Sequence, residues 1–372
     1  MTDIASYRNV YNDLTSDLLS RLNAKDKNLV LSPLSIMTLL AIAADASNGQ
    51  AREEILNYLS EEGETKDLIK TIASIGDLLG RDKALNSANA VCIRKDLEDK
   101  VVPEYPKRLK EIFDGELFSS DDIVTEVNRW AKGKTKGMIE EILDEKQSAL
   151  LAACLLNAVS FVGKWQTEYE DDDVDVIAFT NSDGTEHDVI GLYSKENRYI
   201  ENADVIGFTK PYKNIGYSFM ALLPKKSGNK EMSRILKDLD FSKTFDSAVY
   251  EEAVVTMPEF KNDFSGDLTA LLKESGIETA FTAGADFSNL ADADLYISQI
   301  LHKAHIEVDR QGTKAAAVTA AMMDTGAMPV FDYKTVTLDR PFIYAVIHNE
   351  TKLPVFAGVV NQLEDSTEFN FE

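Results

Sequence analysis

The spacing of apolar residues predicts helices in the first part of the chain. Apolar positions recur at helical spacing from Val10 to Leu22, from Pro33 to Ala46, and over residues 100–114 and 122–143. A turn-forming acidic stretch at residues 119–122 separates the last two segments and supplies a helix cap. We therefore expect helices to dominate up to about residue 150.

Beyond residue 150 the pattern changes to that of strands. Strand-like segments occur at residues 153–161, 205–209, 217–224, 252–257, 296–308, 333–338 and 343–360, and short helical signals occur at 230–239 and 266–275. No linker rich in glycine, proline or serine divides the chain, and no internal repeat is visible. Helices first and strands later predict one α+β domain over residues 1–372 and argue against an alternating, doubly wound βαβ fold.

Charge narrows the range of partners. The formal net charge is -24 and the pI is near 4.6, so the surface should repel nucleic acid, heparin-like polyanions and anionic membranes. No apolar run approaches the length that spans a bilayer. The first residues show no secretory signal, and we favour an extracellular location, with the signal removed, over a cytoplasmic one. The expected partners are neutral or basic proteins.

Candidate catalytic and metal-binding residues are few. Cys92 and Cys154 lie in apolar, strand-like stretches, where buried free thiols are expected rather than a disulfide framework. Gly133-Lys134-Thr135 lacks the upstream glycine of a phosphate-binding loop, and no Gly-x-Ser-x-Gly nucleophile motif occurs. His302 and His305, three residues apart on a strand, face opposite sides and cannot form a metal pair. We expect neither an enzyme nor a metal or cofactor site.

A long connection of unusual composition covers residues 311–332. Connections of this length are often functional, yet residues 315–323 are all small or apolar apart from one threonine. An amphipathic helix is one interpretation. The alternative is a segment that becomes a strand with one buried face when it inserts into a sheet. Every second residue from Thr313 to Met323 is uncharged, and the two charged residues, Lys314 and Asp324, are both in the other set. The uncharged set is Thr313, Ala315, Ala317, Thr319, Ala321 and Met323.

The stretch from Glu307 to Thr319 resembles the hinge of the serpins. In that family a strand end is followed by acidic or polar residues, glycine, threonine or serine, glutamate and a run of small residues. The hinge residues given by this resemblance are Gly312, Thr313, Lys314, Ala315, Ala316, Ala317, Val318 and Thr319. Arg310 and Lys314 stand where the family usually has glutamate. The small-residue run that is typical of inhibitory members is intact, and Gly312 provides a pivot.

Other segments resemble serpins in the same order along nearly the whole chain. They include residues 28–36, 128–139, 156–165, 257–260, 285–288, 301–304, 340–342 and 356–358. The resemblance implies a metastable serpin fold with three β-sheets, eight to nine helices and an exposed reactive-centre loop. Its gating positions match Ser32, Ser35, Asn157 and His302 (the shutter) and Trp165 (the breach). We expect a hydrogen bond between Asn157 and His302.

The resemblance also implies a mechanism. A serine protease attacks the loop and forms an acyl-enzyme, and the hinge side of the loop then enters the central sheet and traps the covalent complex, with the inhibitor acting as a monomer. The family spacing from Arg310 places the scissile bond at Gly326-Ala327, with Thr325-Gly326 as its neighbour. A serpin that does not inhibit is the rival interpretation, and it predicts bulky or charged hinge residues.

The residues around that bond indicate the class of protease. Small side chains at positions 325–327 favour an elastase-like or subtilisin-like target. The methionines at 322, 323 and 328 leave a chymotrypsin-like or cysteine protease open. No lysine or arginine lies between Lys314 and Lys334, which argues against a trypsin-like target.

Overall fold

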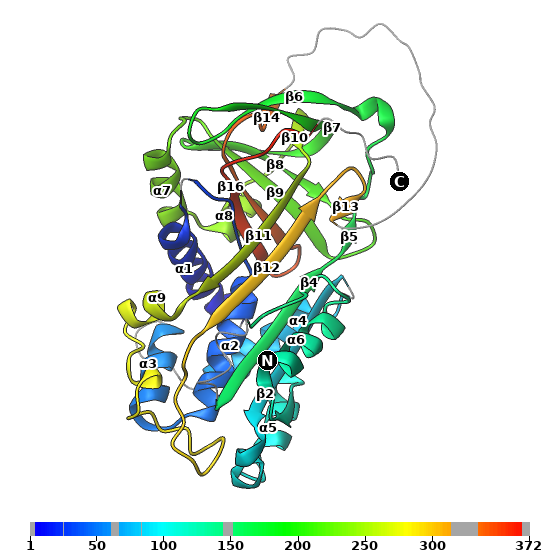
Figure 1. Cartoon of the computed structure of the whole chain (residues 1–372). Coiled ribbons are helices and arrows are strands. Elements are labelled where there is room, and N and C mark those ends of the chain that lie inside the picture. Colours follow the sequence, from blue (N-terminus) through cyan, green and yellow to red (C-terminus); the bar gives the residue numbers. More distant parts are fainter. Residues whose placement is uncertain are drawn as a thin grey trace, which may run out of the picture. The chain divides into compact units, whose positions relative to one another are not determined.

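The structure, a computed structural model, describes residues 4–24, 26–60, 67–82, 84–143, 152–313 and 334–366. These residues form two compact units, each assembled from three stretches of chain. The first unit comprises Met1–Val10, Ser32–Ser160 and Phe264–His305, and the second comprises Tyr11–Leu31, Phe161–Asp263 and Ile306–Glu372. Nine α-helices and three sheets within the described residues confirm the predicted α+β class (Figure 1).

The helices are α1 (Ile4–Leu22), α2 (Pro33–Ala46), α3 (Gly49–Tyr58), α4 (Leu68–Leu79), α5 (Tyr105–Phe113), α6 (Ile123–Lys134), α7 (Asn229–Asp238), α8 (Phe241–Asp246) and α9 (Thr269–Glu274). The strands are β1 (Leu29–Leu31), β2 (Leu85–Arg94), β3 (Glu116–Ser120), β4 (Ala153–Phe161), β5 (Gly163–Lys164), β6 (Val174–Thr180), β7 (Glu186–Glu201), β8 (Val205–Pro211), β9 (Tyr217–Pro224), β10 (Val249–Pro258), β11 (Phe260–Asp267), β12 (Leu301–Val308), β13 (Gly312–Thr313), β14 (Lys334–Thr337), β15 (Phe342–His348) and β16 (Pro354–Val360).

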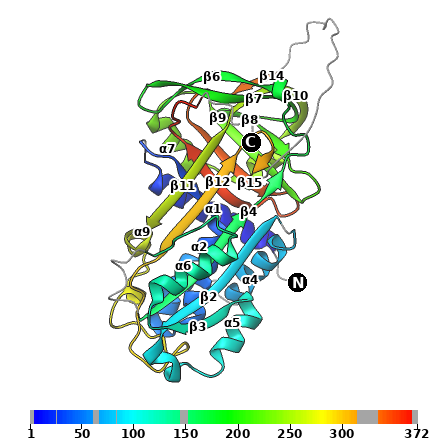
Figure 2. The same ribbon diagram turned by 45° about the vertical axis from the view of Figure 1, so that its right-hand side comes forward.

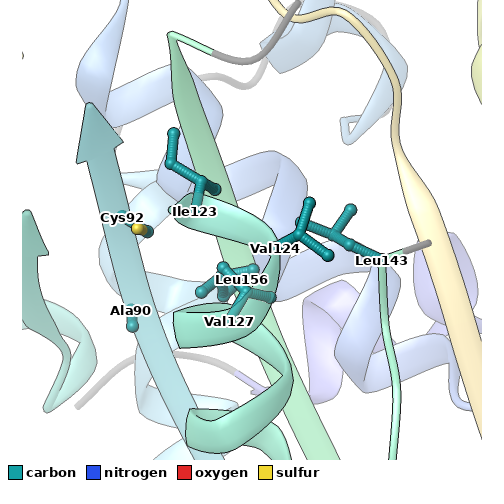
Figure 3. Close-up of a cluster of buried hydrophobic side chains, with 7 residues drawn as sticks. All are labelled: Ala90, Cys92, Ile123, Val124, Val127, Leu143 and Leu156. Carbon is teal, nitrogen blue, oxygen red and sulfur yellow. The ribbon is translucent and has the colours of Figure 1, made fainter. Parts of the chain in front are cut away.

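In the first unit, the three-stranded sheet β3-β2-β4 is covered on one face by α6 (Figure 2). Asp122 caps α6 by accepting a hydrogen bond from the Thr125 backbone amide. Below α6, apolar side chains from the helix and from the strands form a buried cluster (Figure 3). The cluster consists of Ala90, Cys92, Ile123, Val124, Val127, Leu143 and Leu156. It fixes α6 to both β2 and β4.

In the second unit, a nine-stranded sheet runs in the order β1-β16-β15-β9-β8-β7-β10-β14, with β6 paired to β7. Every residue of β9, β15 and β16 is buried, which explains their nearly continuous apolar sequences. The buried Asn262 amide nitrogen donates to the Leu29 carbonyl and to the Tyr344 hydroxyl, which ties β11 to β1 and β15.

The remaining sheet has four strands in the order β11-β12-β13-β5. The two-residue strand β13 lies between β12 and β5, pairing Thr313 with Val308 on one side and with Gly163 on the other. On this side of β12, the stretch from Leu301 to Glu307 has no partner strand in the described chain. An unpaired strand edge can accept an additional strand.

The sequence pattern located most elements but missed some. Helix α2 and strand β9 match the predicted segments at residues 33–46 and 217–224. The extended segment expected at 296–308 is shorter, because β12 begins only at Leu301. Strand β2 was predicted only in its apolar second half, around Cys92, although helices were expected to dominate this part of the chain. Its polar first half and apolar second half, seen in the burial of residues 85–94, give neither a clean period of two nor one of 3.6.

Candidate functional site

The hinge begins with a tight turn that ends β12. Asp309 makes this turn: its Oδ1 accepts hydrogen bonds from the backbone amides of Gln311 (2.8 Å) and Gly312 (3.0 Å), and its own amide donates to the Gly312 carbonyl. Burial raises the pKa of the Asp309 carboxyl. The sequence prediction did not include Asp309, although an aspartate two residues before Gln-Gly is a common turn signal.

Gly312 lies where two backbones approach closely. A Cβ at this position would be 2.2 Å from the Gly163 carbonyl oxygen and 2.7 Å from the Lys164 Cα. Contacts this short cannot be relieved by moving a side chain, so β13 reaches β5 only because residue 312 has no Cβ. Gly312, where we expect a pivot, is thus required for the packing of β13 against β5.

Aromatic side chains hold β13 in place. The Trp165 indole is fully buried, donates from Nε1 to the Asp309 carbonyl at 2.8 Å, and stacks on the Tyr212 ring at 4.7 Å. The Tyr212 hydroxyl lies 2.8 Å from Thr313 Oγ1. Beneath this stack, the Lys210 ammonium forms a buried ion pair with Glu196 (2.7 Å). Trp165 therefore contacts the turn that starts the hinge, and its assignment to the breach stays a prediction.

Arg310, one of the two departures from the family pattern, has acidic neighbours. Glu259 Oε1 accepts from the Arg310 backbone amide (3.1 Å) and lies 3.3 Å from its Nε, with both side chains about four-fifths buried. Asp171 lies 3.7 Å from the Arg310 guanidinium. Asp171 is part of an acidic stretch of sequence at residues 168–173. The unusual charge at Arg310 is balanced rather than left unpaired.

Ser32, Ser35 and His302 meet at the start of α2. Ser32 Oγ caps the helix by accepting from the Ser35 amide (3.3 Å), and the Ser32 amide donates to His302 Nε2 (3.1 Å). The proton of the neutral ring is therefore on Nδ1. Burial lowers the pKa of His302 to about 4, so the imidazole is neutral at physiological pH.

Asn157 does not bind His302. Its Nδ2 donates to Asn89 Oδ1 on β2 at 2.7 Å, and its Oδ1 is buried without a hydrogen-bond partner in the described chain. The expected Asn157–His302 hydrogen bond is absent because β4 and β12 belong to different sheets. A buried amide oxygen without a donor is costly and marks a place where a further group could bind.

Two strand edges of the first unit, one of β4 and one of β12, have no partner strand in the described chain. Within the first unit, β4 and the first half of β12 lie side by side in both ribbon views (Figures 1 and 2), yet no strand in the described residues pairs with the second edge of either. A small cavity of about 30 Å³ lies where they begin, lined by residues 153–155 of β4 and residues 295–300 before β12. Unpaired edges of this kind are templates for an added strand.

Part of the predicted site lies outside the described residues. This applies to the hinge residues Lys314, Ala315, Ala316, Ala317, Val318 and Thr319 and to the scissile-bond residues Thr325, Gly326 and Ala327. In the described parts of the chain, no group of three or more His, Cys, Asp or Glu side chains could hold a metal. No described helix is long and apolar enough to cross a membrane.

Comparison with known families decides the assignment. The family model of serpins, the serine protease inhibitors, matches residues 9–363. The chain belongs to the serpin family. Among its relatives, Iripin-8 of Ixodes ricinus is 28% identical, over 95% of this chain and 92% of that protein.

Solved structures agree with the fold of this serpin. The thermophilic serpin tengpin in its native state is 33% identical, with a TM-score of 0.86 over 95% of this chain and 94% of tengpin. Human thyroxine-binding globulin also matches, with a TM-score of 0.86 over 97% of this chain and 100% of that chain. At 21% identity, that likeness shows the fold alone. Family membership supports protease inhibition in general.

Proposed function

We propose that this serpin inhibits a serine protease as a suicide substrate. The protease serine Oγ attacks the carbonyl carbon of Gly326, the bond to the Ala327 nitrogen breaks, and an ester joins the serpin to the enzyme. The serine proton ends on the Ala327 nitrogen, and residues 327–372 begin with this new amine but stay in the fold, because β14, β15 and β16 belong to the nine-stranded sheet. The inhibitor supplies no catalytic group of its own. It traps the protease after the peptide bond is broken.

The observation that carries the proposal is the position of β13. This strand is already seated between β12 and β5, and β5 is separated from β4 only by Val162. A chain that continues from Thr313 in the same antiparallel register passes between the two unpaired edges. It would pair Ala317 with Val159 and Ala304, and Thr319 with Asn157 and His302.

This register matches the composition of the hinge. Thr313 is buried (2% exposed), so the alternate set that contains it would point into the core during insertion. That set is uncharged and mostly alanine, which fits between strands with little clash. Thr319 would bring a hydroxyl donor to the orphan Asn157 oxygen. Lys314 would lie directly opposite Glu307, so the second departure from the family pattern would also gain an acidic partner.

Insertion supplies the free energy for trapping. About ten residues, 314–323, can join the two edges, and at about 1 kcal/mol net for each new hydrogen bond this releases on the order of 10 kcal/mol. That is comparable with the stability of a typical domain, and it supports a metastable native state. The protease, joined to the loop by its ester, would be carried along β4.

We propose an elastase-like or subtilisin-like target, because the side chains around Gly326 are small. A monomeric, secreted inhibitor formed by a single domain over residues 1–372 is the accompanying prediction. Its lysines near the end of α6 are paired with glutamates, Lys132 with Glu140 and Lys134 with Glu116, which supports the expectation that heparin-like polyanions do not bind.

The test is incubation with pancreatic elastase, subtilisin, chymotrypsin and trypsin, followed by denaturing gels and mass spectrometry of the released peptide. The proposal expects a complex with elastase or subtilisin that survives denaturation, and a peptide that begins at Ala327 or Gly326. Cleavage by all four enzymes without any complex, and without a rise in thermal stability, would overturn it.

A further inference from the structure

The cysteines of the first unit are on neighbouring strands. The Arg94 amide donates to the Ala152 carbonyl at 2.9 Å, which sets the antiparallel register of β2 against β4. In this register Asn89 lies directly opposite Asn157, and their side chains are indeed hydrogen-bonded at 2.7 Å. Two independent contacts therefore fix one alignment. The same alignment places Cys92 directly opposite Cys154.

Both cysteines are on the face of the sheet that α6 covers. Figure 3 shows Ala90 and Cys92 on β2 and Leu156 on β4 directed toward the same cluster as the α6 side chains. Cys154 is two residues before Leu156, which puts it on the same face, and it packs against that cluster. Neither cysteine is bonded in this structure.

The spacing suits a cross-strand disulfide. Arg94 and Ala152 form a hydrogen-bonded pair, so Cys92 and Cys154, two residues further along each strand, form one as well. The Cα atoms of such a pair are about 5.5 Å apart. Disulfides span Cα separations of about 4.4 to 6.8 Å.

We infer that Cys92 and Cys154 form a redox-modifiable thiol pair whose disulfide ties β4 to β2 and slows the insertion of a strand at the free edge of β4. The second clause rests on the proposed function, whereas the first does not. β4 has β2 on one edge and no partner on the other in the described chain. When a strand is added, β4 must readjust against β2 and α6, and a covalent bond removes that freedom.

The oxidant is a small-molecule disulfide such as oxidised glutathione. The thiolate of Cys154, which is the less buried of the two cysteines, attacks one glutathione sulfur, and one glutathione leaves. The thiolate of Cys92 then attacks the Cys154 sulfur and expels the second glutathione. The two protein protons end on the two glutathiones, so two thiols are oxidised and one disulfide is reduced. Burial raises the pKa of both thiols to about 12, so the exchange is slow at neutral pH.

The first experiment needs no protease. The purified full chain is incubated at pH 8.5 with oxidised glutathione, and its intact mass and peptide map are recorded without reduction. We expect the loss of two hydrogens and a linked peptide pair that contains Cys92 and Cys154. Stable glutathione adducts on the separate cysteines would overturn the inference that they form a pair. The same holds if both thiols of the folded chain stay free under conditions that oxidise the unfolded chain.

The second experiment compares the oxidised and reduced protein with the protease that the wild type traps. We expect oxidation to lower the fraction of covalent complex several-fold in favour of cleaved inhibitor, and dithiothreitol to restore it. Cys154→Ala should trap normally and be insensitive to the oxidant. Equal partitioning of the oxidised and reduced forms would overturn the link to insertion. Absence of complex in both forms would instead contradict the proposed function and leave the mass result valid.

Discussion

The two ends of the predicted insertion path differ in how completely they are bonded. Around β13 in the second unit, backbone pairing on both sides, the Trp165–Tyr212 stack and the Arg310–Glu259 pair hold the start of the hinge, although the buried Gln311 Oε1 has no hydrogen-bond partner in the described chain. Around Asn157 in the first unit, two strand edges have no partner in the described chain, and a buried amide oxygen has no donor. In the proposed mechanism, the bonded region positions the hinge, and a new strand that pairs with the unbonded edges would supply the free energy for trapping.

The largest expected effect comes from a charge in the alternate set of hinge residues that we propose to face the core after insertion. Ala317→Glu would place a carboxylate between Val159 and Ala304, where its burial without a partner costs several kcal/mol. We expect cleavage without any denaturation-resistant complex. Ala316→Glu is the matched control, because residue 316 would face the half-exposed His305 and should retain most of the complex. Equal loss in both variants would contradict the register.

Gly312→Ala tests the bonded region. The added Cβ would clash with the Gly163 carbonyl, so β13 should detach from β5 and the native state should lose about 3 to 4 kcal/mol. Urea unfolding measures this loss. Gly133→Ala in α6, where the added Cβ meets open space, should be neutral or slightly stabilising. An unchanged midpoint for Gly312→Ala would show that β13 does not depend on this close approach.

Acidification should weaken the first unit through His302. Its folded pKa of about 4 lies below the ordinary value of 6.5, so the unfolded chain binds a proton that the folded chain does not. The contribution of the neutral His302 to the free energy of unfolding is therefore fully present above pH 6.5. It falls by about 3 kcal/mol as the pH drops to 4. Urea midpoints between pH 7 and 4 should fall less in His302→Gln than in the wild type, with His305→Gln as the control. Parallel curves for all three proteins would contradict the buried neutral imidazole.

The smallest effect is expected at the Arg310–Glu259 pair. Arg310→Glu places three carboxylates together with Glu259 and Asp171, and we expect a loss of about 1 to 2 kcal/mol, since the pair is only partly shielded from solvent. The swapped double variant Arg310→Glu/Glu259→Arg should recover most of it. Failure of the swap would mean that the pairing contributes nothing to the hinge.

The sequence predicted elements with strong periodicity, such as α2 and β9, and it predicted membership of the serpin family from segments along nearly the whole chain. It could not predict that Asn157 bonds to Asn89, because that contact depends on the register of two strands far apart in the chain. The partners of Arg310 could not be predicted for the same reason. Glu259 is fifty-one residues away in the sequence, and only the folded chain brings it close to Arg310. The local pattern of apolar residues predicts where strands lie. Which strand edges remain unpaired depends on contacts between residues far apart in the sequence.

Hydrogen exchange before and after cleavage of the loop tests the central claim most directly. The amides at the free edges of β4 (153–160) and β12 (301–307) should exchange readily in the intact protein and become strongly protected after cleavage, while those around β13 change little. Unchanged exchange at both edges in the cleaved protein would contradict the claim that the hinge becomes a strand between them.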